Sequence, residues 1–132
     1  MARLLFVLAA TTLLAGPAQA LPPTFASFGR EGGNIIPFTV TITQSGEVRS
    51  SGPVEVGRTK LTAAQLAGLV QTEVQAGFSA LPATTACPGT LPDIATTWIK
   101  AGSRLVRVHG SCSKRFLRVW NALAATVLLS YG

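Results

Sequence analysis

Two strand-turn-strand patterns, each followed by a segment with helical periodicity, most constrain how this chain can fold. Residues 38–43 alternate apolar residues with threonine, and residues 95–100 and 104–109 flank the turn Gly102-Ser103. Helical spacing of apolar residues follows Thr62 and again follows Ser113. The order predicts an α+β fold of the type ββαββα, in which two helices cover one face of a four-stranded antiparallel sheet.

The first hairpin can close in two registers. A two-residue loop would pair Ile42 with Arg49 and mix the two faces of the hairpin. A three-residue loop over residues 44–46 would pair Ile42 with Val48 and keep apolar residues on one face. We expect the second register, because Gly46 can adopt the left-handed backbone conformation that such a loop requires.

Both predicted helices carry start signals. Thr62 and Gln65 have the spacing of a capping box, and Gly77 is placed to end the first helix. Either Ser111 or Ser113 can cap the last helix. The predicted buried stripes are Leu66, Leu69, Val70 and Val74 in the first helix and Phe116, Trp120, Leu123 and Val127 in the last.

The N-terminus has the pattern of a secretory signal peptide. Arg3 precedes twelve uncharged residues, 4–15, which are too few to span a bilayer that needs about 20. The small-x-small sequence Ala18-Gln19-Ala20 predicts cleavage after residue 20, so we expect residues 1–20 to be removed. The protein would then be secreted, either to the extracellular medium or to a periplasm, without membrane attachment.

The remaining chain is long enough for one domain. Residues 21–36 are rich in proline and glycine, and we expect them to form an irregular lead-in. Residues 37–132 then form a single α+β domain.

Cys87 and Cys112 are the only two cysteines among the 132 residues. Cysteine pairs outside the cytosol usually form disulfides, so we predict a bond between these two. In the chain-entropy model a loop of this length gives roughly 3 kcal/mol of stabilisation. The spacing is not that of a Cys-x-x-Cys redox motif, which argues against a catalytic thiol.

Several motifs occur in a recognisable order. Gly77-Phe78-Ser79 follows the first predicted helix, Cys87 precedes Leu91-Pro92-Asp93, and residues 107–112 read Arg-Val-His-Gly-Ser-Cys. This order resembles a family of small bacterial secreted domains of unknown function, over about residues 35–128. The resemblance implies a hairpin–helix fold and no established activity.

Residues with catalytic or metal-binding chemistry are sparse. His109 is the only histidine, and the five carboxylates Glu31, Glu47, Glu55, Glu73 and Asp93 are scattered. We therefore expect no metal site, no cofactor and no enzymatic activity. A small hydrolase using His109 with Asp93 and Ser111 stays an alternative, although cross-strand counting places these residues on different pairs.

The sheet face away from the helices is the strongest candidate for a binding surface. A two-residue turn in the second hairpin pairs Trp98 with Arg107 and suggests a cation–π contact between them. The expected face comprises Arg49, Trp98, Lys100, Arg107 and His109, together with threonines 39, 41 and 43. An exposed tryptophan among cations suits a protein, a glycan or an anionic polymer. Alternatively, the lead-in covers Trp98.

A second basic group opens the last helix. Lys114, Arg115 and Arg118 could hold an anion together with the helix N-terminus, or could simply form a solvated basic face. The formal net charge of +6 is modest, and the aromatic residues fall mainly on core stripes, so we expect no nucleic-acid partner.

These patterns favour a secreted, disulfide-linked binding module without catalysis. One alternative is a secreted inhibitor of a hydrolase that presents the loop 82–93. Three prolines and the disulfide would make that loop rigid, and rigidity lowers the entropic cost of binding.

Overall fold

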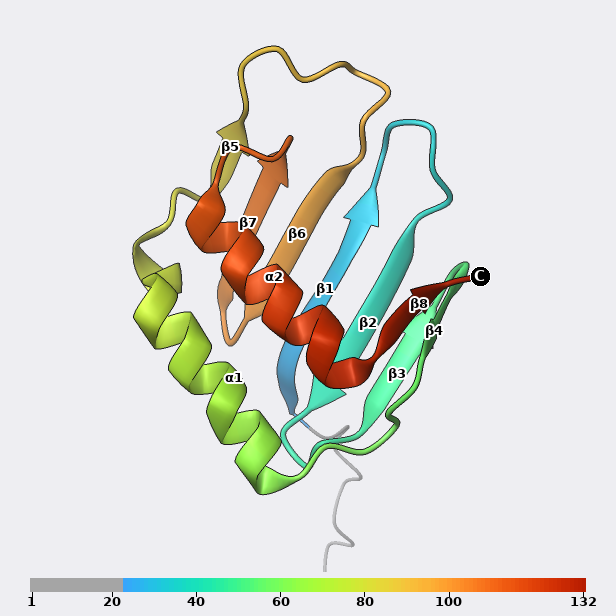
Figure 1. The fold of residues 1–132 in the computed structure, drawn as a ribbon, viewed down its shortest axis with the longest axis vertical. Helices are drawn as coiled ribbons and strands as arrows, with labels where there is room; N and C mark the ends of the chain where they lie inside the picture. The colour runs from blue at the N-terminus through green and yellow to red at the C-terminus, as the bar shows by residue number, and fades with distance from the viewer. Residues whose placement is uncertain (1–22) are drawn as a thin grey trace, which may run out of the picture.

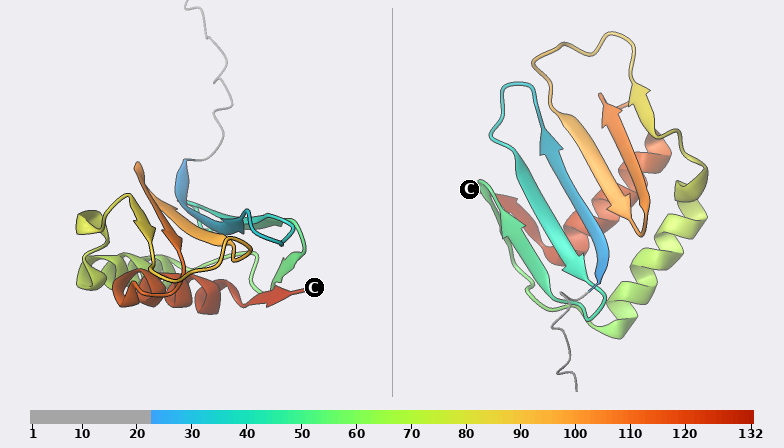
Figure 2. Two further views of the ribbon diagram at one scale, coloured as in Figure 1. Left: turned by 90° about the horizontal axis from the view of Figure 1, so that it is seen from above. Right: turned by 180° about the vertical axis from the view of Figure 1, so that it is seen from behind.

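Six strands form one sheet, and both long helices lie on a single face of it (Figure 1; Figure 2, left). This computed structural model describes residues 23–132, so the predicted signal peptide lies outside the described residues. The elements in chain order are β1 (Thr24–Glu31), β2 (Phe38–Thr43), β3 (Val48–Ser51), β4 (Val54–Val56), α1 (Ala63–Ala76), η1 (Phe78–Ala80), β5 (Thr84–Ala86), β6 (Thr96–Ala101), β7 (Arg104–His109), α2 (Lys114–Val127) and β8 (Leu129–Tyr131).

The prediction of an irregular lead-in over residues 21–36 is wrong for half of its length. Residues 24–31 form β1, which lies in the middle of the sheet order β3-β2-β1-β6-β7-β5 and pairs antiparallel with both β2 and β6. Its side chains alternate, because Ala26 and Phe28 are fully buried beneath the helices while Ser27 and Gly29 face the other way. The prolines and glycines that suggested irregular structure flank the strand, apart from Gly29.

The predicted four-stranded antiparallel sheet is also corrected at its edges. β5 pairs parallel with β7 within the segment that we expected to be a loop. β4 and β8 pair with each other in a separate two-stranded ribbon. Each of these strands has three residues, which is too short for an alternating pattern to be recognised in the sequence.

Both hairpin registers are as predicted. Ile42 pairs with Val48, and Gly46 in the connecting loop has a φ of 90°. In the second hairpin Trp98 pairs with Arg107 and Ile99 with Val106. These registers give the sheet one apolar face for the helices.

The predicted helix caps are confirmed. The capping box of Thr62 and Gln65 is formed, Gly77 ends α1 with a φ of 64°, and the Ser113 side chain caps α2. The four expected core residues of α2 are all buried. The expected stripe of α1 is wrong in part, since Val70 and Val74 are exposed. α1 packs mainly beside α2, so only a narrow side of it is covered (Figure 1).

The disulfide between Cys87 and Cys112 is present, with 5.6 Å between the two Cα atoms. It links the residue after β5 to the segment that leads into α2. The Cys87 amide also donates a hydrogen bond of 2.9 Å to the His109 carbonyl oxygen. Among residues 23–132, no helix has the length and apolar character needed to cross a membrane.

A pair of glycine substitutions tests the central placement of β1. A Cβ atom on Gly29 would overlap the carbonyl oxygen of Phe38, so Gly29→Ala should destabilise the protein by about 1–3 kcal/mol. A Cβ atom on Gly68 in α1 meets no other atom, so Gly68→Ala should stabilise it by about 0.5–1 kcal/mol. Urea unfolding of both variants measures the difference, and equal effects would argue against a central β1.

Candidate functional site

The uncovered face of the sheet, which we call the open face, carries three rows of cross-strand neighbours. Strand pairing defines one row as Arg49, Thr41, Ser27 and Lys100, the next as Thr39, Gly29, Trp98 and Arg107, and the third as Glu31, Thr96 and His109. The structure thus brings four of the five predicted residues together on β6 and β7. Arg49 lies apart on β3, with β2 and β1 in between.

Trp98 is half-buried rather than freely exposed. Atom Cζ2 of its ring lies 3.0 Å from the position that a Cβ on Gly29 would occupy, so the indole leans over the backbone of β1. An aromatic ring that covers a glycine on a neighbouring strand protects an otherwise bare stretch of backbone. Trp98 therefore packs against β1, the strand formed within the expected lead-in.

Arg107 has a different partner from the one expected. Its Nε lies 3.4 Å from Oε1 of Glu31, across the open face. The cation–π contacts found among residues 23–132 belong to Arg30 and do not include Trp98 with Arg107. Lys100 stays exposed on the same face and forms no ion pair within residues 23–132, whereas the charge of Arg107 is partly offset by Glu31.

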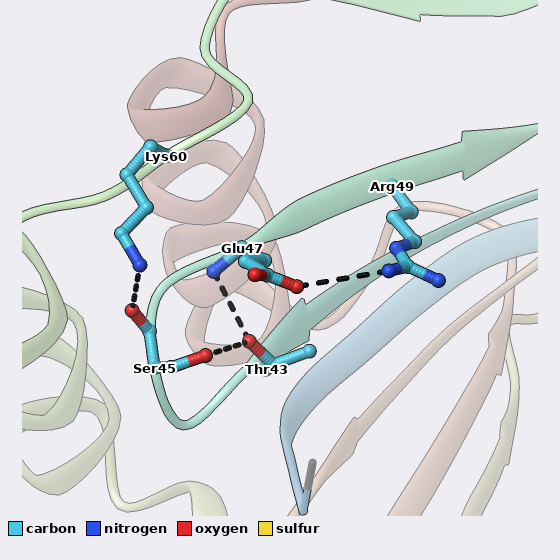
Figure 3. Close-up of polar contacts among 5 residues, drawn as sticks. All are labelled: Thr43, Ser45, Glu47, Arg49 and Lys60. Atoms are coloured by element: carbon cyan, nitrogen blue, oxygen red, sulfur yellow. Dashed lines mark hydrogen bonds and ion pairs between the residues drawn. The ribbon is translucent and has the colours of Figure 1, made fainter. Parts of the chain in front are cut away.

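Arg49 lies beside a polar turn (Figure 3). Its Nη2 is 3.7 Å from the Glu47 carboxylate, and the Glu47 amide donates to the Thr43 hydroxyl at 3.1 Å. Lys60 donates to the Ser45 carbonyl oxygen at 2.6 Å. An exposed pair such as Arg49 with Glu47 contributes little stability. These contacts order the β2–β3 turn and leave Arg49 at the margin of the open face.

His109 ties a loop to the sheet. Its Nε2 lies 2.9 Å from the carbonyl oxygen of Ile94, where an N–H of the ring donates. Among the described residues, neither Asp93 nor Ser111 has a side-chain hydrogen bond to this ring. The arrangement expected of a catalytic triad is not assembled here.

The predicted inhibitory loop 82–93 is ordered by several contacts. Its first part includes β5, and the disulfide follows at Cys87. The Thr90 amide donates to the Cys87 carbonyl oxygen at 3.2 Å, and the Ile94 amide donates to that of Leu91 at 3.1 Å. Leu91, 62% exposed, is the most prominent apolar side chain of this segment.

The basic residues at the start of α2 separate into two roles. Arg115 donates from Nε to the Ala76 carbonyl oxygen at 2.7 Å and from Nη2 to that of Gly77 at 3.0 Å. A cation at the last carbonyls of a helix satisfies them and interacts favourably with the helix dipole. Arg115 therefore anchors the C-terminus of α1 to α2. Lys114 and Arg118 are exposed.

A site that the sequence analysis missed surrounds Arg30. This residue lies on β1 with its side chain on the helix side, and its Cζ is 5.2 Å from the ring centroid of Trp120 and 5.8 Å from that of Tyr131. Its Nε is buried and makes no hydrogen bond within the described part of the chain. Ala26, Phe28 and Arg30 are spaced two residues apart, as in a strand. This spacing could have placed Arg30 on the same side as two apolar residues, which is unusual for a charged side chain.

An apolar hollow of about 300 Å³ adjoins the Arg30 side chain. Its walls are residues of the β1–β2 connection, of β2 and of the C-terminal segment, with one residue before β4: Ile35, Ile36, Phe38, Pro53, Tyr131 and Gly132. The β1–β2 connection and β8 both lie on the right of Figure 1, and residues of both line the hollow. The hollow thus lies where segments far apart in the sequence meet.

Glu73 and Arg104 line a smaller hollow next to α1. Oε1 of Glu73 and Nε of Arg104 are both buried without a hydrogen-bond partner among the described residues. Burial raises the pKa of the Glu73 carboxyl above its ordinary value of 4.5, because the charged form is poorly solvated there.

Removing the ionisable group of Glu73 should stabilise the protein at neutral pH. The folded state holds this proton more tightly than the unfolded chain does, so stability falls as the pH rises from the ordinary pKa through the raised pKa. Glu73→Gln should reduce that fall. Urea midpoints at about pH 4 and about pH 7 measure it, with Glu55→Gln, at an exposed position of β4, as the control. A larger fall in the Glu73 variant would contradict the argument.

Two tryptophan substitutions test the assignment of the two sheet faces. Trp120→Ala removes a buried ring from the core and should cost about 3–5 kcal/mol. Trp98→Ala removes a half-buried ring from the open face and should cost about 1–2 kcal/mol. Chemical denaturation of both variants is the measurement. Equal losses would mean that Trp98 belongs to the core.

Comparison with known proteins adds no relative, because no family model, no curated protein sequence and no solved structure matches the chain. The resemblance to small bacterial secreted domains therefore stays a prediction. The molecule has three candidate binding surfaces, which are the open face, the loop 82–93 and the hollow beside Arg30.

Proposed function

We propose that this protein is a secreted, disulfide-linked binding module without catalysis, whose partner docks on the open face. The observation that carries this proposal is the one-sided cover of the sheet. Both long helices lie on one face, while the other presents Trp98, Lys100 and Arg107 at adjacent positions (Figure 2, left). A surface with an aromatic ring between two cations suits a protein, a glycan or an anionic polymer with acidic groups.

The rigidity of the open face supports this proposal. Trp98 and Arg107 sit directly opposite each other on β6 and β7, and β1 flanks Trp98 on its other side. Paired strands fix the backbone positions of these side chains, so only the side chains themselves are ordered when a partner binds, which limits the entropic cost.

Secretion is supported by two independent features. One is the signal-peptide pattern of residues 1–20, with Ala18 and Ala20 before the predicted cleavage point. The other is the bond between Cys87 and Cys112, since disulfides persist mainly in oxidising compartments.

A second candidate function is inhibition of a hydrolase by the loop 82–93. The observation in its favour is Leu91, an exposed apolar side chain on a segment held by the disulfide and by backbone hydrogen bonds. A pre-ordered loop of this kind binds a cleft at low entropic cost. A hydrolase using His109 is the third candidate and has less support, because the Nε2 of that ring is engaged by Ile94.

Charge-matched double variants distinguish these candidates once a partner has been captured from the secreted fraction. Lys100→Ala with Arg107→Ala removes two cations from the open face and should weaken binding about tenfold or more. Lys114→Ala with Arg118→Ala removes the same charge from α2 and should weaken binding far less. Affinities at matched ionic strength provide the measurement.

Leu91→Ala separates the loop from the open face in the same assay. On the proposed function it should leave the affinity nearly unchanged. If only Leu91→Ala weakens binding, the inhibitor function replaces the proposed one. If both double variants weaken binding equally, the attraction is a general charge effect and the open face is not the site.

A further inference from the structure

We propose that the hollow beside Arg30 is a second binding site, which takes a small molecule with an apolar body and a carboxylate. The site is on the helix side of the sheet, whereas Trp98 and Lys100 lie on the open face. The inference therefore does not depend on the function proposed above.

The aromatic rings that contact Arg30 do not use its N–H groups, which can therefore donate hydrogen bonds to a ligand. Its guanidinium lies within 6 Å of the rings of Trp120 and Tyr131. Aromatic rings contact the flat faces of a guanidinium, while its N–H donors point outward in the plane. Two such donors match the two oxygens of a carboxylate.

Arg30 forms no ion pair within residues 23–132. Its neighbour Glu31 pairs with Arg107 on the open face. The Nε of Arg30 is buried inside the protein, so a ligand in the hollow would bond the Nη groups. A cation that is partly withdrawn from water and unpaired is costly, and a bound carboxylate would compensate that cost.

The walls of the hollow define the rest of the ligand. Ile36 is 71% exposed, Tyr131 58% and Ile35 40%, and all three line the same hollow. Large apolar side chains gathered in this way around one hollow mark a ligand site more often than scattered ones do. A volume of about 300 Å³ is at the lower end of the range for small-molecule pockets, which favours a short alkyl carboxylate such as octanoate.

The other side of Arg30 suits an apolar body less well. A hollow of about 370 Å³ there is lined by the hydroxyl-bearing residues Thr90, Thr97 and Ser111 as well as by Ile94. An alkyl chain in that hollow would cover polar groups without bonding them, which costs free energy. The apolar body therefore belongs on the side of Tyr131.

Titration with octanoate and with 1-octanol tests the site. The chain has two tryptophans, so in a Trp98→Phe background the fluorescence reports Trp120 alone, next to Arg30. Octanoate should bind saturably and about tenfold more tightly than octanol, because only octanoate gains the charge-assisted hydrogen bonds. Equal affinities, or no saturable octanoate binding below micelle formation, would overturn the proposal.

Two variants in the same background locate the bound carboxylate. Arg30→Met keeps a long apolar side chain beside Trp120, and it should lower octanoate affinity to that of octanol without changing octanol binding. Arg118→Met, an exposed cation on α2, should change neither. If Arg30→Met binds octanoate as tightly as the parent, the carboxylate is not held by Arg30 and the proposal fails.

The apolar wall gives a test that does not depend on the folding of the Arg30 variant. Ile36→Ser changes an exposed side chain and should weaken octanoate and octanol alike. Leu91→Ser changes a comparably exposed apolar residue outside this hollow and should weaken neither. Equal effects of the two substitutions would indicate non-specific apolar binding and would overturn the proposal.

Discussion

The burial of Phe28 against Trp120 is the contact on which the rest of the structure depends. The two rings meet edge to face with 5.2 Å between their centroids, and Phe28 has no exposed surface. Phe28 lies at the middle of β1, the strand that joins the hairpin of β2 and β3 to the hairpin of β6 and β7. An isolated hairpin is marginally stable in water, so the two halves of the chain form one core because β1 pairs with both.

Both candidate binding surfaces follow from the alternation along this same strand. Gly29 points to the open face, and its lack of a side chain lets the indole of Trp98 lie over the strand. Arg30 points the other way, into the aromatic cluster of Trp120 and Tyr131. Two neighbouring residues thus shape opposite sides of the sheet, and a shift of one residue in the register of β1 would exchange them.

Several side chains whose chemistry suggested activity instead hold segments together. His109 fastens the segment around Ile94 to β7, and Arg115 holds the last carbonyls of α1. The disulfide joins the end of β5 to the entrance of α2. These contacts hold the long connections between the strands and helices in place.

The sequence alone determined the features that depend on near neighbours in the chain. The hairpin loop at Gly46, the capping box of Thr62, the left-handed end at Gly77 and the buried stripe of α2 follow from backbone preferences and from helical or two-residue periodicity. The disulfide followed because only two cysteines exist. Only the tertiary structure decided that β1, β5 and β8 are strands, that Val74 is exposed and which residues surround Arg30. A strand bounded by glycines and prolines, or one of three residues, depends on its pairing partners for stability. For β1 the distant partner is β6, and β5, β4 and β8 likewise pair with strands far away in the sequence. The hollow beside Arg30 has the same origin, since its walls come from β1, β2, the β1–β2 connection and β8, which meet only when the sheet has formed.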